Sequence, residues 1–296
     1  MKSYVINKND AGQRLDKFIS KAVPALPKNL MYKYIRLKRI KLNKKRCEIS
    51  DRLCEGDGLE LYINDEFFET SDSRGETEFL NVSDKINVIY EDENILLVNK
   101  PCGLVVHEDD ENSQDTLINR IKKYLYTRGE YDPESEASFA PSLCNRLDRN
   151  TQGIVICAKN AESLRILNSA VKFRMIDKRY LCVTVGEQKP KETVLHAFLV
   201  KKESKNRVYV YDHEVLGSKS IVTGYKVLKT CGELSLCEIE LITGRTHQIR
   251  AHMAYIGCPL LGDGKYGTNE FNRKYRVKTQ ALCAYKLSFK SDAELG

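Results

Sequence analysis

Excess positive charge is confined to the first 65 residues of this 296-residue chain. That stretch holds 15 Lys and Arg against 8 Asp and Glu, whereas the other residues hold 33 of each sign. A basic module joined to an electrically balanced domain is typical of proteins that bind a polyanion. The split therefore predicts a molecule in two parts, with a small basic module in front of a larger domain. A basic surface that is merely solvated would give the same count.

Composition excludes several classes of protein. The chain is 42% hydrophobic and 30% charged, which is ordinary for a globular protein. It has no apolar run near the roughly 18–20 residues of a membrane span, and MKSYVINKND lacks the apolar core of a signal peptide, so we expect a cytoplasmic protein. The ten cysteines form no C-x-x-C pair and the five histidines no ligand cluster. We therefore expect reduced thiols, no metal and no cofactor.

Residues 12–65 have the pattern of two helices followed by a hairpin. Apolar residues at 15, 18, 19 and 22 follow helical spacing, and Pro24 ends that helix. A second helix is predicted from 28 to 38, and a strand–turn–strand unit follows with its turn at Asn43-Lys44. The candidate polyanion-binding residues lie on this second helix and the hairpin: Lys28, Lys33, Arg36, Lys38, Arg39, Lys44 and Lys45.

The order AGQRLDKFI, basic helix, RIKLNKKR and EGDGLEL resembles the S4 domain, a small RNA-binding module. The resemblance implies that residues 1–65 grip folded RNA, mainly through its phosphates. Lys44 stands where the family's turn usually has glycine, which should affect turn geometry rather than binding. Residues 66–85 are acidic and polar without a sustained period, so we predict a linker that lets the basic module move.

From residue 86 the chain is rich in β-patterned runs. Strands are predicted at 86–90, 95–99 and 154–158, with several more between 178 and 243. Helices are predicted at 115–126, after Asn160 and near 246–256. Because these elements do not alternate as regular βαβ units, residues 86–296 should form an α+β domain with a mixed, mainly antiparallel sheet.

Asp148 is the first candidate for chemistry. It lies in NRLDRNTQG (145–153), a charged turn in front of a buried strand. Arg146 and Arg149 flank it, and nearby positive charge should keep its carboxylate ionised. The ordinary alternative is a carboxylate that caps a turn or pairs with an arginine.

Two further segments carry candidate residues. Arg250 projects from a helix that Thr246 is expected to cap, with Arg245 just before the helix start, where anions are attracted. The loop GCPLLGDGKYG after it suits close approach to a ligand. Tyr180 heads a strand in KRYLCVTVG. Taken separately, these residues have ordinary explanations as well: an exposed basic helix for the arginines, and packing in the core or at a sheet edge for Tyr180, which is the usual role of a tyrosine at a strand start.

Together the segments KPCGLVVH, NRLDRNTQG, KRYLCVTVG, TGRTHQIRAHMAYIGCPLLGDGKYG and QALCAYKLSF resemble the RluA-type pseudouridine synthases in order and spacing. The resemblance implies the fold of that family and isomerisation of uridine to pseudouridine in RNA. It also implies three catalytic residues: Asp148 as the essential aspartate, Tyr180 packed on the target base, and Arg250 paired with the aspartate. The substrate-binding residues it implies are Arg146, which would help displace the base from the RNA stack, Arg245 and Lys100.

Two departures keep alternatives open. Asn145 and Gln152 stand where the family usually has His and Ser. A catalytically inactive RNA-binding or ribosome-assembly protein on the same fold is therefore the main rival to an enzyme. A glycoside-type hydrolase would need a second carboxylate in a comparable motif, and none is present. Family members with an S4 domain usually act on large ribosomal RNA, which is the expected substrate, with transfer RNA as the alternative.

Overall fold

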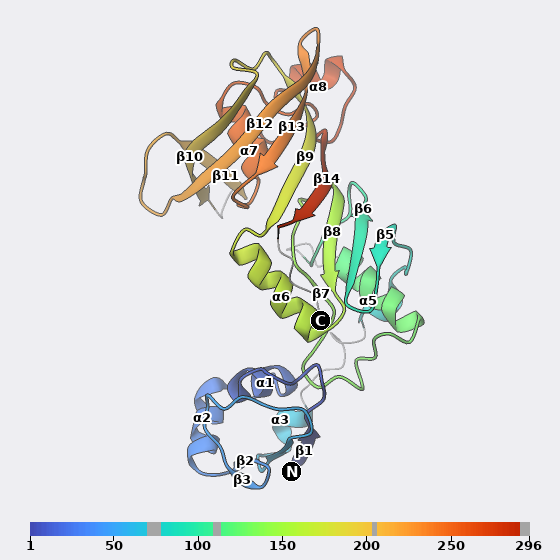
Figure 1. Ribbon diagram of the computed structural model, residues 1–296, viewed down its shortest axis with the longest axis vertical. Coiled ribbons are helices and arrows are strands. Elements are labelled where there is room, and N and C mark those ends of the chain that lie inside the picture. Colours follow the sequence, from blue (N-terminus) through green and yellow to red (C-terminus); the bar gives the residue numbers. More distant parts are fainter. Residues whose placement is uncertain (70–77, 109–113, 203–205, 291–296) are drawn as a thin grey trace.

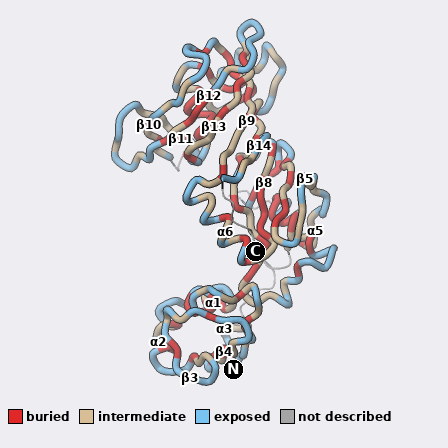
Figure 2. The backbone as a smooth tube through the Cα atoms, in the orientation of Figure 1, coloured by how far each residue is buried: buried red, intermediate tan, exposed pale blue. Residues whose placement is uncertain are grey.

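The computed structural model describes residues 1–69, 78–108, 114–202 and 206–290 and contains two β-sheets (Figure 1). A four-stranded sheet lies in the N-terminal part, and a ten-stranded sheet lies in the remainder of the chain. Each part has a core of its own, and buried residues lie in both parts (Figure 2). The predicted division into two parts therefore corresponds to two separately packed cores.

The N-terminal part packs two helices against the small sheet. Both helices were predicted, as α1 (Leu15–Ala22) and α2 (Lys28–Arg36), but α2 ends two residues early because Lys38 adopts a left-handed conformation with φ of 60°. The sheet has the antiparallel order β1-β4-β2-β3. Its strands are β1 (Lys2–Val5), β4 (Gly58–Leu61), β2 (Ile40–Leu42) and β3 (Lys45–Arg46), of which β1 was not predicted.

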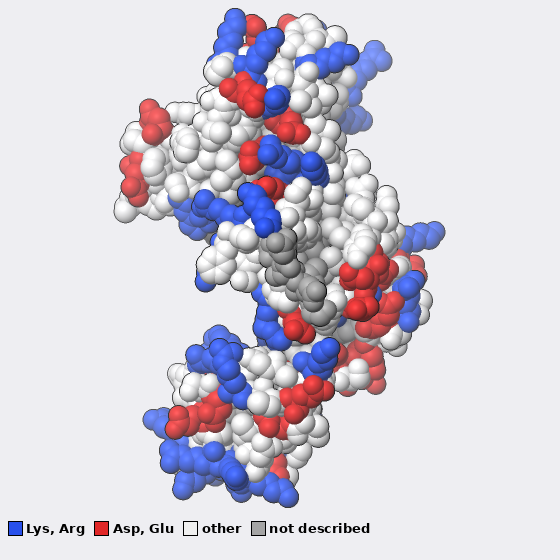
Figure 3. Space-filling model, viewed as in Figure 1, with Lys and Arg blue, Asp and Glu red and all other residues white. Residues whose placement is uncertain are grey.

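The hairpin turn between β2 and β3 tolerates a lysine where glycine would be favourable. Asn43 and Lys44 both have positive φ, 51° and 61°, as the tight turn of a β-hairpin requires. The Asn43 side chain steadies it by accepting from the Gly58 N–H and donating to Asp57. All seven basic residues predicted to bind a polyanion are exposed. Lys and Arg gather over α2 and this hairpin (Figure 3).

Both ends of the segment predicted as a linker, residues 66–85, depart from that prediction. Helix α3 (Glu66–Glu69) places Phe67 and Phe68 against the N-terminal core. The 3₁₀ helix η1 (Glu78–Asn81) buries Phe79 in the large core. Aromatic side chains that can reach a core override a polar composition, and the middle of the segment, 70–77, lies outside the described residues.

The basic module was expected to move on its linker, but polar contacts join it to the larger domain. Ser138 donates a 2.5 Å hydrogen bond to the buried Asp10, and Asn9 donates a 2.6 Å bond to Glu136. Asn9 also accepts from the backbone N–H of Ala161 at the start of α6. These contacts involve buried or half-buried groups, so they hold the module in one orientation.

The ten-stranded sheet has the order β11-β10-β12-β13-β9-β14-β8-β6-β5, with β7 pairing β8. Every pair is antiparallel except β14 with β8, which confirms the mixed, mainly antiparallel sheet. Its strands are β5 (Val88–Glu91), β6 (Ile95–Lys100), β7 (Ser142–Leu143), β8 (Gln152–Ala158), β9 (Ile176–Val185), β10 (Glu192–Lys202), β11 (Arg207–Tyr211), β12 (Lys219–Cys231), β13 (Leu234–Leu241) and β14 (Leu282–Phe289).

Within the described residues, four α-helices accompany this sheet: α5 (Leu117–Thr127), α6 (Ala161–Lys172), α7 (Gln248–Tyr255) and α8 (Asn269–Lys274). The predicted cap of α6 is confirmed, since the Asn160 side chain accepts from the Ser163 N–H at 2.8 Å. Helix α7 contacts β11 and β12. It stops at Gly257, whose φ of 78° ends the helix as predicted.

Gly153, which follows the turn that carries Asp148, gives the first prediction. It has φ of 126°, and an added Cβ would lie 2.2 Å from the Ala284 carbonyl oxygen on β14. Because neither backbone can yield cheaply, Gly153→Ala should lower the free energy of unfolding by roughly 3 kcal/mol or more. Gly264→Ala, where a Cβ meets nothing within 4 Å, is the control. Equal urea midpoints for the two variants would contradict the close approach.

Candidate active site

Five of the predicted site residues line one pocket of about 830 Å³. They are Arg146, Asp148, Tyr180, Arg245 and Arg250. The size is within the roughly 300–1,000 Å³ typical of small-molecule sites. The residues come from the turn before β8, from β9 and from the start of α7, so the fold joins segments about 100 residues apart.

The turn that presents Asp148 is fastened by backbone contacts. The Thr151 N–H donates to the Asp148 carbonyl at 3.0 Å, which closes the turn. The Arg149 carbonyl accepts from the Gly103 N–H and from the ammonium of Lys100 at 2.8 Å. The turn that carries Asp148 is thereby tied to the segment that follows β6.

Lys100 was expected to bind substrate, and the structure contradicts this. Its side chain is fully buried and lies outside the residues that line the pocket. Its three N–H bonds all go to carbonyls, those of Pro101, Leu104 and Arg149, so no donor is left for a ligand. Burial lowers the pKa of Lys100 to about 8. Lys100 therefore stabilises the turn that carries Asp148, through its bond to the Arg149 carbonyl.

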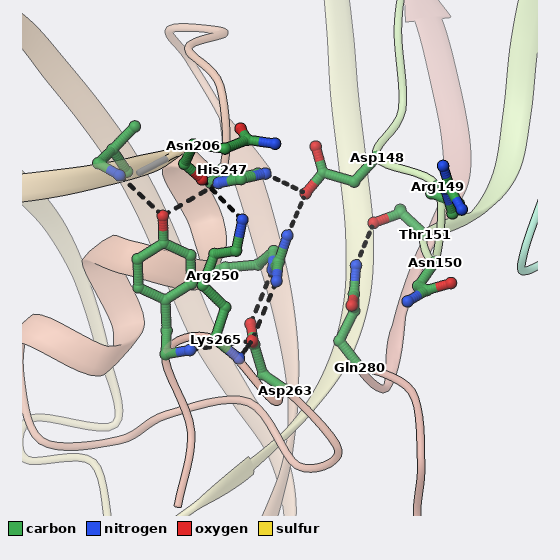
Figure 4. Close-up of polar contacts among 12 residues, drawn as sticks. Asp148, Arg149, Asn150, Thr151, Asn206, His247, Arg250, Asp263, Lys265 and Gln280 are labelled. Atoms are coloured by element: carbon green, nitrogen blue, oxygen red, sulfur yellow. Dashed lines mark hydrogen bonds and ion pairs between the residues drawn. The ribbon is translucent and has the colours of Figure 1, made fainter. Parts of the chain in front are cut away.

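Arg250 connects two carboxylates (Figure 4). Its Nε and Nη2 donate to Asp263 at 2.7 and 3.0 Å, and its Nη1 donates to Oδ2 of Asp148 at 2.9 Å. Burial alone would lower the pKa of Arg250, but the two carboxylates outweigh it and raise that pKa. The guanidinium therefore stays charged, and its planar fork sets the position of Asp148.

Asp263 is the residue of the site that sequence reasoning missed. It is fully buried, and burial acts to raise its pKa, but Arg250 and the N–H groups of Lys265 and Tyr266 lower it overall. The available signal was a lone Asp inside GDGKYG. We expected the glycines of that loop to admit a ligand, but a Cβ on Gly262 would lie 2.0 Å from the Thr279 carbonyl oxygen. Close approach of the chain to itself explains that glycine.

The start of α7 also differs from the prediction. Thr246 was expected to cap the helix, but the cap position belongs to His247, whose side chain makes no capping bond. Gln248, the first residue of the helix, instead fixes the segment before it, because its Oε1 accepts from the Arg245 N–H at 3.1 Å and from the hydroxyl of Thr243. The helix start is thus held by an amide side chain, and His247 is turned into the pocket.

The other pocket residues have distinct surroundings. Tyr180 lies within β9 rather than at its head, and is 5% exposed. Burial, reinforced by the charge of Asp148, raises the pKa of Tyr180. Arg146 and Arg245 are exposed at the pocket. A neutral phenol and two exposed cations suit a ligand with an aromatic ring and a negative charge.

Asn145 fills a structural position beside Asp148. Its Oδ1 accepts from the Ile156 N–H at 2.8 Å, and its Nδ2 donates to the Ile154 carbonyl at 3.2 Å. Both ends of the amide thus bind β8. The departure from the family's usual histidine leaves the Asp148–Arg250 contact intact. Gln152, the other departure, is exposed and lies outside the pocket lining.

Comparison with known proteins identifies the family. A model of the RNA pseudouridylate synthase family matches residues 94–255, more than half of the chain, and a model of the S4 domain matches residues 13–59. The chain belongs to the RNA pseudouridylate synthase family. It is an RNA pseudouridine synthase, an isomerase, with an N-terminal S4 domain, as the motifs predicted.

Individual relatives agree over nearly the full chain. An uncharacterised RNA pseudouridine synthase of Mycoplasma genitalium is 33% identical over 97% of this chain and 88% of its own length. The ribosomal large subunit pseudouridine synthase C of Rickettsia bellii is 34% identical over 87% of this chain and 83% of its own. The solved structure of human RNA pseudouridylate synthase domain containing 4 shares the fold, with a TM-score of 0.56 and 23% identity over 68% of this chain and 83% of that one.

Two further findings concern the described residues alone. No helix there combines the length and the apolar composition that a membrane crossing requires. Nor does this part of the chain hold three or more His, Cys, Asp or Glu side chains grouped to bind a metal ion. The ten cysteines are free thiols, and six of them are buried.

The Asp263–Arg250 pair gives the second prediction. Asp263→Asn keeps the shape but removes the charge that fixes Arg250, so the guanidinium will shift toward Asp148. We expect kcat to fall by about 100-fold while RNA affinity is retained, since a displacement near 1 Å can cost that much. Asp212→Asn, an exposed carboxylate beside His213, is the matched control. Wild-type kcat in a folded Asp263→Asn protein would refute the positioning role.

Proposed function

We propose that this enzyme converts uridine to pseudouridine in large-subunit ribosomal RNA, with Asp148 as the catalytic carboxylate and residues 1–65 as the module that grips the RNA. The observation that carries the proposal is the 2.9 Å contact between Asp148 and Arg250 inside a pocket that solvent reaches. The Asp148 side chain is 26% exposed there, so a nucleotide has access to it.

The reaction requires a positioned carboxylate more than any other group. Pseudouridine formation breaks the C1′–N1 bond, turns the uracil and joins C1′ to C5, and the C5 proton is released. A carboxylate acts in such a step as a nucleophile or as a base. Arg250 occupies Oδ2 of Asp148, whereas Oδ1 has no hydrogen-bond partner within the described part of the chain. Oδ1 is therefore the oxygen that would meet the nucleotide (Figure 4).

Tyr180 and Arg146 would handle the base. The ring of Tyr180 supplies an apolar face for the uracil while it turns. With its pKa raised, the Tyr180 hydroxyl keeps its proton at neutral pH. A target base inside a helix must first leave the stack, at a cost of a few kcal/mol. Arg146 is exposed at the pocket, where it can fill the gap that the base leaves.

The choice of ribosomal RNA rests on relatives and on charge. Relatives in Rickettsia bellii and Vibrio vulnificus, 34% and 32% identical, are ribosomal large subunit pseudouridine synthases. The seven exposed cations of α2 and the β2–β3 hairpin make no ion pair with a carboxylate among the described residues. They are thus available to RNA phosphates, so the charge supports an RNA substrate and the relatives indicate ribosomal RNA.

Replacement of the carboxylate tests the chemistry. Asp148→Asn should abolish tritium release from large-subunit ribosomal RNA transcribed with 5-tritiated uridine, because the amide cannot attack or take a proton. RNA affinity should stay within a few-fold of wild type. Asp177→Asn, whose parent side chain is 28% exposed and pairs with Lys290, is the matched control. Release from Asp148→Asn at a near wild-type rate would defeat the assignment, and release from transfer RNA alone would change the substrate.

Charge removal tests the basic module. The triple variant Lys33→Ala, Arg36→Ala, Lys44→Ala should bind ribosomal RNA more weakly and reduce the slope of log affinity against log salt by about 2, since each phosphate contact contributes roughly 0.7–0.9. The single-turnover rate at saturating enzyme should change little. The control removes three exposed lysines of the larger domain, Lys85, Lys189 and Lys226. An unchanged slope in the first variant would count against the module.

A further inference from the structure

His247 is held in an unfavourable backbone conformation beside the catalytic carboxylate. Its φ is 52°, in the left-handed region that residues with a side chain rarely adopt. Its imidazole is 11% exposed and lines the pocket. Backbone strain of this kind costs about 1–3 kcal/mol and accumulates at functional sites. The strain is therefore a reason to ask what the ring does.

Hydrogen bonds determine which ring nitrogen carries the proton. The hydroxyl oxygen of Tyr266 accepts from the Val208 N–H at 2.9 Å and lies 3.0 Å from Nδ1 of His247. A phenol has one proton, and Nδ1 is the acceptor that the described residues offer it. Nδ1 thus accepts, and the imidazole proton is on Nε2.

Nε2 faces the catalytic aspartate (Figure 4). It lies 3.9 Å from Oδ2 of Asp148, the same oxygen that accepts from Arg250. That separation exceeds a hydrogen bond by nearly 1 Å, and contacts of this kind commonly tighten when substrate enters. Two donors on Oδ2 would fix the carboxylate plane and leave Oδ1 directed at the nucleotide.

We propose that His247, kept as the Nε2–H tautomer by Tyr266, is a positioning residue that joins Arg250 in holding Oδ2 of Asp148. This inference rests on the proposed catalytic role of Asp148. It makes Tyr266 part of the active site, although its hydroxyl acts only through His247. The ring of Tyr266 also packs against the Arg250 guanidinium, 5.3 Å from the ring centre, so one side chain supports both donors.

The role requires a neutral imidazole. Burial lowers the pKa of His247, Asp148 and Asp263 act to raise it, and Arg250 and Lys265 lower it further. Arg207 on β11 lies over the Tyr266 ring, with its guanidinium carbon 5.1 Å from the ring centre. Because the net shift is downward, the ring is neutral at pH 7. Protonation at lower pH adds a second cation beside Asp148, and the ion pair it forms makes the carboxylate less reactive. We therefore expect kcat to fall as the pH drops through the pKa of His247.

Nuclear magnetic resonance on the full chain, with ring-¹⁵N-labelled histidine, tests the tautomer directly. The His247 signals are assigned as those missing in His247→Gln. At pH 7.5 we expect the Nε2–H pattern in wild type and a mixture of tautomers in Tyr266→Phe. An Nδ1–H pattern in wild type would overturn the proposal. This measurement needs no RNA, so it decides the tautomer even if the proposed substrate is wrong.

Kinetics test the positioning role on tritiated large-subunit ribosomal RNA. Tyr266→Phe should lower kcat at least about 10-fold with KM unchanged, the loss expected for one bond to a charged group. In Tyr266→Phe the fall of kcat at low pH should begin at a higher pH, because the Tyr266 hydroxyl no longer favours the neutral form of His247. In His247→Gln this fall should disappear. Tyr255→Phe, exposed at the end of α7, is the control. If the wild type is active and Tyr266→Phe keeps the same kcat and pH profile, the positioning role of His247 and Tyr266 is refuted, whereas the proposed function is not.

Discussion

Arg250 binds two carboxylates that have opposite surroundings. Asp263 is fully buried and takes two of the guanidinium's N–H bonds, whereas Asp148 takes one and is 26% exposed. Asp263 therefore cancels the charge of Arg250, and the pair is a neutral support on which Asp148 keeps a net negative charge. A lone arginine would instead neutralise Asp148 and make it a weaker nucleophile or base. The buried carboxylate, which no nucleotide needs to touch, is what leaves the exposed one reactive.

The rest of the fold serves to bring these three side chains together. Asp148 precedes β8, and β14 lies between β8 and the strand that carries Tyr180. Gly153 lets β14 approach the turn closely, and the buried ammonium of Lys100 fastens the turn from the opposite side. Separating Arg250 from Asp263 would leave a buried charge without a partner, at a cost of about 3–5 kcal/mol, so the guanidinium that contacts Asp148 is held in place before RNA arrives.

Sequence patterns predicted the residues that line the pocket better than the residues that support them. Asp148, Tyr180 and Arg250 lie in ordered motifs, and they line one pocket as expected. The support was less visible, because backbone carbonyls leave no trace in a sequence, and Lys100 was predicted to bind substrate rather than to support the turn. Asp263 was missed for a related reason: a carboxylate in a glycine-rich loop looks like a turn residue until tertiary packing buries it. Propensity alone likewise cannot show a left-handed His247.

The docking of the two parts of the chain could not be predicted from the sequence either, and it affects how the RNA would be selected. Charge and pattern predicted a basic module on a linker. In the sequence Asn9, Asp10 and Ser138 look like ordinary polar loop residues. Only the structure shows that Asp10 bonds to Ser138 and Asn9 to Glu136, and that these bonds dock the module on the larger domain. Phosphate contacts position an RNA without reading its sequence. A docked module would hold the bound RNA phosphates at a fixed distance from Asp148. A uridine would then be selected only if the fold of the RNA places it at that distance from those phosphates. Selectivity would then depend on rigidity between the two parts as much as on the pocket itself.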